Sequence, residues 1–72
     1  MNREELGKRL RAVRAHLGIT QSAMAAQLGV TLYTLREMED GKACITVENI
    51  NTLSSMGFNK NYFFEHNAAM IS

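Results

Sequence analysis

Glycine divides this 72-residue chain into a series of short amphipathic stretches. Four of the five glycines directly follow such a stretch, and a threonine or an asparagine stands ahead of each one. Glycine readily ends a helix in the left-handed conformation, while threonine and asparagine side chains cap the free N–H groups at a helix start. The pattern predicts helices over residues 2–18, 20–29, 31–41 and 46–57, and a last short helix that opens at Asn59 or Asn61.

Apolar residues recur along these stretches with the period of a helix. In the first stretch, apolar residues follow one another at spacings of four, three and four, which places them on one stripe. There is no proline, and runs of strand-forming residues are missing. We therefore expect an all-α, compact, five-helix domain. The expected inward residues are Leu6, Leu10, Val13, Leu17, Met24, Ala25, Leu28, Leu35, Met38, Val47, Ile50, Leu53, Met56, Phe58 and Phe63.

The charged residues are distributed unevenly, although the net charge is only +1. The first 20 residues carry five basic against two acidic side chains, whereas the remainder carries three against five. A nearly neutral domain can thus present one basic face to a partner such as nucleic acid. A merely solvated, charged helix face is the alternative interpretation of the same pattern.

Several classes of protein are disfavoured by what the sequence lacks. A single cysteine cannot form an internal disulfide, no secretory signal is recognisable, and no apolar stretch approaches the length of a membrane span. We expect a reduced cytoplasmic protein with no membrane partner. His16, Cys44 and His66 lack the spacing of metal ligands, so we expect no enzyme activity, cofactor, metal or small-molecule ligand. Cys44 is expected to be a small apolar filler.

The stretch from residue 20 to residue 41 predicts two helices that cross steeply at a tight turn. A small side chain, Ala25, stands where the second helix must cross the first, and Gly29 supplies the positive φ of the turn. Val30, Leu35 and Met38 follow at positions that point back toward the first helix. This arrangement is typical of a helix-turn-helix unit.

The stretch LGKRLRAVRAHLGITQSAMAAQLGV, followed by LREMEDGK, resembles the Cro/repressor-type helix-turn-helix family, also called the xenobiotic-response-element family. The resemblance covers roughly residues 4–64 and extends to the ending LSSMGFNKNYFF. It implies a five-helix lambda-repressor-like domain, which we place at residues 1–66, and we expect residues 67–72 to form a C-terminal tail that can join a dimer interface. It also implies a phage- or mobile-element-type repressor whose third helix enters the major groove of a palindromic DNA operator as a homodimer.

The outward face of the third helix holds the candidates for reading bases. The resemblance implies contacts from its first residues and from those one turn later, which are Thr31, Leu32, Tyr33, Arg36 and Glu37. Arg36 can pair bidentately with guanine, Glu37 can accept from the amino group of cytosine, and Leu32 can touch a thymine methyl. The alternative for Arg36 and Glu37 is that they are ordinary exposed residues.

Candidate phosphate ligands lie around this helix. Gln21 opens the second helix, where free N–H groups and the helix dipole favour an anion. In the family, this glutamine binds phosphate and often braces a base-reading side chain. The other candidate phosphate ligands are Lys42, just beyond the third helix, and Arg9 or Arg11 of the first helix. The family also commonly joins the positions of Arg14 and Glu39 in a partly buried ion pair, so we assign both to structure.

The C-terminal segment is rich in large apolar side chains, and so small a domain cannot bury all of them. The candidates for a self-complementary dimer patch are Tyr62, Phe64, Met70 and Ile71. The alternative is an apolar terminus that frays.

Two departures from the family pattern keep a second function open. The loop after the third helix offers only Lys42, and in that helix Arg36 stands against three acidic residues. Few phosphate contacts imply weak nonspecific binding and a shallow dependence on salt. The rival hypothesis is a protein-interaction module of the same fold, such as an antitoxin, that uses Leu32, Tyr33 and the aromatic tail.

Overall fold

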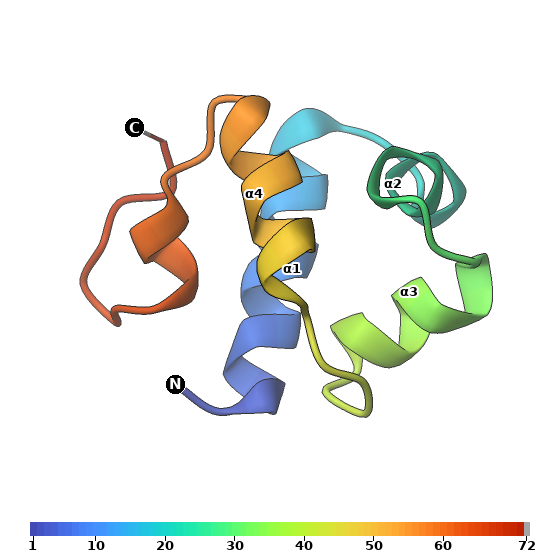
Figure 1. Cartoon of the computed structure of the whole chain (residues 1–72), viewed down its shortest axis with the longest axis horizontal. Helices are drawn as coiled ribbons and strands as arrows, with labels where there is room; N and C mark the ends of the chain where they lie inside the picture. The colour runs from blue at the N-terminus through green and yellow to red at the C-terminus, as the bar shows by residue number, and fades with distance from the viewer. Residues whose placement is uncertain (72) are drawn as a thin grey trace.

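The computed structural model describes residues 1–71, which form an all-helical structure (Figure 1). Its elements are α1 (Arg3–Leu17), α2 (Gln21–Leu28), α3 (Leu32–Glu39), α4 (Val47–Ser55) and the short 3-10 helix η1 (Lys60–Phe63). α1 and α4 occupy the centre, with α2 and α3 to one side and the C-terminal segment to the other (Figure 1). No helix in the described part is long and apolar enough to cross a membrane.

The expectation of five α-helices is wrong, because the fifth element is a single 3-10 turn. Here the Tyr62 N–H donates to the Asn59 carbonyl, and the Phe64 N–H donates to the Asn61 carbonyl, both at 3.0 Å. The chain then returns on itself: the Asn59 N–H donates to the Met70 carbonyl at 2.9 Å. Both ends of this segment are thereby held together, and its one helical turn is of the 3-10 type.

The predicted tail, residues 67–72, runs back along the molecule as far as it is described. Phe58 and Ile71 form an isolated antiparallel β-bridge, and residues 1–71 contain no longer strand. The last residue of the predicted tail, residue 72, lies outside the described residues.

Side-chain caps begin all four α-helices at the residues that the sequence predicts. Each capping side chain accepts a hydrogen bond from the backbone N–H three residues later, and the caps are Asn2, Thr20, Thr31 and Thr46. At α4 the bond is reciprocal, because the Asn49 side chain accepts from the Thr46 backbone N–H at 3.0 Å. Such caps stabilise a helix start by about 1 kcal/mol each.

The core lies where α1, α2, α3, α4 and the C-terminal segment meet. Its buried apolar residues are Leu10, Val13, Met24, Ala25, Leu28, Leu35, Met38, Ile50, Leu53, Phe58 and Phe63. All eleven belong to the predicted inward set. Leu6, Leu17 and Met56 are only partly buried and pack against the edge of the core.

Two predicted inward side chains point outward instead. Val47 is 66% exposed, because it lies in the first turn of α4 before that helix meets the core. Cys44 is exposed as well, so its assignment as an apolar filler is wrong. Its neighbours Ala43 and Ile45 pack against the core, whereas the Cys44 side chain lies on the outside of the loop.

Gly7 allows α1 and α3 to approach each other closely. A Cβ atom at this position would lie 2.5 Å from the carbonyl oxygen of Glu39 and 2.6 Å from that of Met38. Both obstacles are backbone atoms at the end of α3, so a side chain could be accommodated only by moving one helix. Gly7 is thus a packing residue inside α1, whereas the other four glycines have a positive φ.

We expect Gly7→Ala to lower the free energy of unfolding by about 2 kcal/mol, although alanine is intrinsically favoured over glycine in helices by about 1 kcal/mol. Urea denaturation measures the change. Ala15→Gly, at an exposed position of α1, is the control that reports intrinsic helix propensity alone. A stabilised Gly7→Ala variant would show that close helix contact does not determine this position.

Arg9 fastens the C-terminal segment to α1. Its guanidinium donates to the carbonyls of Tyr62 at 2.8 Å, Glu65 at 3.2 Å and His66 at 2.7 Å. The same group lies 4.5 Å above the centre of the Tyr62 ring, within the range of a cation–π interaction. One side chain therefore satisfies three carbonyls at and beyond the end of η1.

We expect Arg9→Met to loosen residues 59–71 locally, because three carbonyls lose a charged donor while the aliphatic part of the side chain is retained. Hydrogen exchange of the Asn59 amide should accelerate at least tenfold, with a much smaller change at Val13 in the core. Lys8→Met, at the exposed neighbouring position, serves as the control. An unchanged exchange rate at Asn59 would contradict the assigned role.

Candidate nucleic-acid interface

α2 and α3 are joined by a tight turn centred on Gly29. This residue has a φ of 68°, and its N–H and that of Val30 bond back to the carbonyls of Ala26 and Ala25, at 3.2 Å and 3.0 Å. Thr31 then accepts from the Thr34 N–H at 3.0 Å and begins α3. Ala25 is buried beneath the crossing, as expected for a small residue at that position. The turn is therefore fixed by backbone hydrogen bonds on one side and by a side-chain cap on the other.

The predicted base-reading residues differ in their exposure. Thr31, Tyr33 and Arg36 are exposed, whereas Leu32 and Glu37 are partly buried. Leu32 lies three residues before Leu35, so it borders the stripe that α3 turns toward the core. Tyr33 is 72% exposed, and it is the most exposed large apolar side chain among the described residues.

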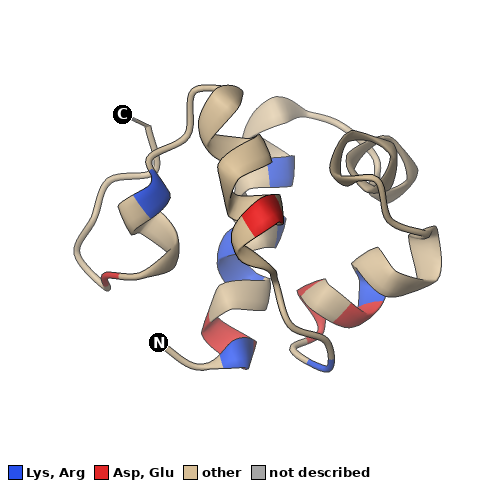
Figure 2. Cartoon of the chain, viewed as in Figure 1, with Lys and Arg blue, Asp and Glu red and all other residues tan. Residues whose placement is uncertain are grey.

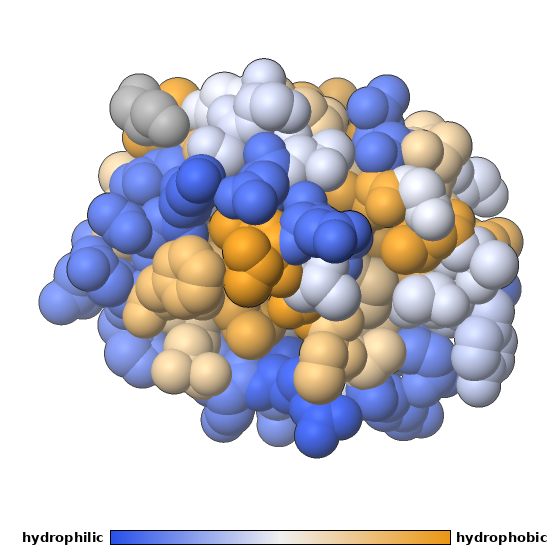
Figure 3. All heavy atoms as spheres, viewed as in Figure 1, coloured by the Kyte–Doolittle hydropathy of each residue, from blue (hydrophilic) through white to orange (hydrophobic). Residues whose placement is uncertain are grey.

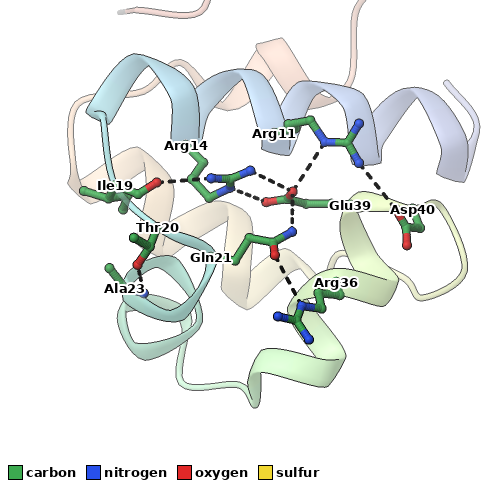
Figure 4. A network of polar contacts seen from close by, with 9 residues as sticks. All are labelled: Arg11, Arg14, Ile19, Thr20, Gln21, Ala23, Arg36, Glu39 and Asp40. Carbon is green, nitrogen blue, oxygen red and sulfur yellow. Dashed lines mark hydrogen bonds and ion pairs between the residues drawn. The ribbon is translucent and has the colours of Figure 1, made fainter.

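A buried carboxylate connects three helices beneath this face (Figure 4). The Glu39 side chain of α3 has no exposed surface. Arg14 of α1 donates to it twice, from Nε at 2.7 Å and from Nη2 at 3.3 Å. Arg11 Nε adds a longer contact at 3.4 Å. The structure therefore contains the Arg14–Glu39 ion pair that the family resemblance implies, with Arg11 as an additional partner.

Gln21, the first residue of α2, extends this network to the outer face of α3. Its Nε2 donates to Glu39 Oε1 at 3.2 Å, and its Oε1 accepts from Arg36 Nε at 3.3 Å. Arg14 Nη1 also donates to the carbonyl of Ile19 in the loop between α1 and α2, at 3.2 Å. The polar side chains thus connect α1, the loop, α2 and α3, and they end on the exposed Arg36 (Figure 4).

The environment of Glu39 shifts its pKa in two directions. Burial raises the pKa, but hydrogen bonds from Arg14, Gln21 and Arg11, together with the charge of Arg14, outweigh burial and hold the pKa below its ordinary value. A carboxylate with a lowered pKa stabilises the folded state fully above the unfolded pKa of about 4.3. That contribution is lost as the pH falls through the folded pKa.

Residues 5–53 match the family described as the helix-turn-helix domain, a stretch that includes both helices of the turn and most of α1 and α4. The chain belongs to the helix-turn-helix domain family. No curated protein gives a significant match. Membership of this family is consistent with a DNA-binding regulator of the Cro/repressor type.

The predicted phosphate ligands of this helix-turn-helix domain lie in different surroundings. Arg11 is half exposed and also donates to Asp40 at 3.3 Å. Lys42 is exposed in the loop after α3, where its carbonyl accepts from Arg3 at 3.4 Å. Arg9 is engaged with the C-terminal segment instead. The structure therefore gathers Gln21 and Arg11 around the Glu39 carboxylate and joins Arg36 to it through Gln21, whereas Arg9 is not part of that cluster.

Charge is concentrated on some helices and missing from others (Figure 2). α1 carries most of the basic residues, whereas α2 has no charged side chain. The described residues enclose no pocket and bring together no group of three or more potential metal ligands. The candidate site of the helix-turn-helix domain is an open surface.

Sequence reasoning missed how closely Arg11 and Gln21 are tied to Glu39. One signal was present, because Arg11 and Arg14 are three residues apart and therefore share a face of α1. No comparable signal connects Gln21 to Glu39, since this contact depends on how α2 crosses α3.

We expect Glu39→Gln to lower the free energy of unfolding by about 2–4 kcal/mol at neutral pH, because it leaves Arg14 without a charged partner. The variant should also lose less stability than the wild type between about pH 7 and pH 3, since glutamine does not titrate. Urea denaturation at several pH values measures both effects.

Asp40→Asn is the matched control, because it removes the same charge from the neighbouring, half-exposed pair with Arg11. We expect Asp40→Asn to lower the free energy of unfolding by less than about 1 kcal/mol. Equal losses in the two variants would contradict a central role for the buried carboxylate.

Proposed function

We propose that this protein is a sequence-specific DNA-binding transcriptional regulator that places α3 in the major groove of its operator. The observation that carries the proposal is the exposed Arg36 of α3, held by Gln21 from α2, in a chain of the helix-turn-helix family. Arginine is the commonest side chain for reading guanine, and an arginine that is already oriented loses less freedom on binding.

The base-reading face would consist mainly of Thr31, Tyr33 and Arg36, which are all exposed. Leu32 and Glu37 lie at its edges, where they can contact a thymine methyl and the amino group of cytosine. Tyr33 offers an aromatic ring and a hydroxyl to a base or a phosphate. This face would read shape and methyl groups as well as hydrogen bonds.

Phosphate contacts would come from Gln21, Arg11 and Lys42, which flank α3. Arg9 is the weaker candidate of the α1 pair, because its guanidinium already donates to three carbonyls. Because so few cationic side chains would contact phosphate, binding would release few counterions from the DNA. The affinity should therefore depend only weakly on salt concentration.

A homodimer on a palindromic operator would double these contacts. Apolar surface is visible on the face that presents α4 and the C-terminal segment (Figure 3). Two of the four predicted dimer residues are substantially exposed, Phe64 at 55% and Ile71 at 49%, and Val47 of α4 is exposed as well. Tyr62 and Met70 are partly buried against the core and would form the base of such a patch. Repression by promoter occlusion in the cytoplasm of a phage or mobile-element host is the role that we propose.

Selection from a random duplex library at low salt tests the proposal, and we expect a palindromic sequence to be enriched. Arg36→Ala should weaken binding to that sequence by roughly 5- to 150-fold and relax the preference at one base pair of each half-site. Lys60→Ala removes an exposed charge from η1, and it should leave affinity and preference almost unchanged. Equal binding by wild type and Arg36→Ala would refute the assignment of Arg36.

A second candidate function is supported by Tyr33, whose large exposure on α3 is also typical of a protein-binding surface. In that case the domain would bind a protein partner, as an antitoxin does. Failure to enrich any palindrome, together with loss of partner binding in Tyr33→Ala, would favour this alternative.

A further inference from the structure

The side-chain amide of Gln21 lies between two groups of opposite hydrogen-bonding character (Figure 4). Its Nε2 faces the Glu39 carboxylate at 3.2 Å, and its Oε1 faces Arg36 Nε at 3.3 Å. An ionised carboxylate can only accept hydrogen bonds, and a guanidinium can only donate them. The amide therefore satisfies both neighbours in only one of its two orientations.

Glu39, at the buried end of this series of contacts, sets the orientation of the Gln21 amide. Glu39 is held by Arg14 and Arg11 from α1, and its side chain has no exposed surface. Reversing the amide would place its oxygen against the carboxylate and its NH2 group against Arg36. Arg36 is exposed at the other end, and within residues 1–71 its side chain hydrogen-bonds only to Gln21. Orientation is thus transmitted outward, from Glu39 through Gln21 to Arg36.

We propose that Glu39 is a positioning residue for sequence readout, which acts through the Gln21 amide to hold the Arg36 guanidinium on the outer face of α3. This inference rests on the proposed function. Arg36 Nε is engaged by Gln21, and within residues 1–71 its two terminal nitrogens make no hydrogen bond to protein. Those two nitrogens form the edge that can donate bidentately to O6 and N7 of a guanine.

The first test uses the free protein, so it does not depend on DNA. In ¹⁵N-resolved NMR spectra, the Arg36 Nε–H should exchange with water at least threefold more slowly in the wild type than in Gln21→Met. The control is Gln27→Met, which changes an exposed glutamine of the same helix and should leave the rate unaltered. Equal exchange in wild type and Gln21→Met would overturn the proposal.

The role of Glu39 itself is tested in two ways. In the wild type, the amide protons of Gln21 should show nuclear Overhauser effects to the guanidinium protons of Arg11 or Arg14. Nuclear Overhauser effects from these protons to the Arg36 Nε–H alone would mean that the Gln21 amide is reversed. That result would overturn the proposal. Glu39→Met removes the acceptor for the Gln21 amide. Where this variant folds, it should lose the slow exchange at Arg36, and retained slow exchange would also overturn the proposal. The Overhauser measurement remains decisive where that variant does not fold.

The second test uses the enriched duplex and a duplex changed at the base pair whose preference Arg36→Ala relaxes. Gln21→Met should reduce the affinity ratio between the two by about threefold to tenfold, as expected for the loss of one orienting hydrogen bond. Gln27→Met should retain the wild-type ratio. If Gln21→Met weakens both complexes equally, Gln21 is a phosphate ligand only and the positioning role is wrong.

The two proposals fail in distinguishable ways. A wild type that enriches an operator while Gln21→Met keeps full discrimination would refute the positioning role and leave the proposed function intact. A wild type that enriches no operator would refute the proposed function and, with it, the readout role of Glu39. In that case slow exchange at Arg36 would identify the chain of contacts as purely structural.

Discussion

The arrangement of the helix-turn-helix unit depends on one buried carboxylate. Glu39 has no exposed side-chain surface, so its charge is tolerable only because donors from α1 and α2 converge on it. Arg14 comes from α1, Gln21 from α2 and the carboxylate from α3, and each helix is thereby fixed relative to the other two. Gly7 supports the same junction by letting the end of α3 lie directly on the backbone of α1.

This junction connects stability with the proposed recognition of DNA. The network begins in the interior as an ion pair and ends on the surface at Arg36, where a base edge can be read. Residues that hold the helices together also limit the freedom of the side chain that would contact DNA. Arg9 fastens the C-terminal segment to the other side of α1, so α1 connects the proposed recognition face to the proposed dimer face.

Features determined by local chemistry could be predicted from the sequence. The caps, the glycine stops and the central apolar stripe follow from neighbouring residues, and the turn at Gly29 follows in the same way. The Arg14–Glu39 pair came from the family resemblance and not from spacing. Contacts between distant segments could not be predicted. The close approach at Gly7, the use of Arg9 by three carbonyls and the exposure of Cys44 all depend on how the helices pack.

We propose that DNA is bound by the face built on α3 and oriented by the Glu39 network. Chemical-shift mapping during titration with duplex DNA at low salt is the test. We predict that the largest shifts will occur at Gln21, at residues 31–36 and at the Arg36 Nε–H, and that shifts over residues 60–66 will be smaller. Shifts concentrated on the C-terminal segment, with α3 unaffected, would show that α3 does not bind the DNA.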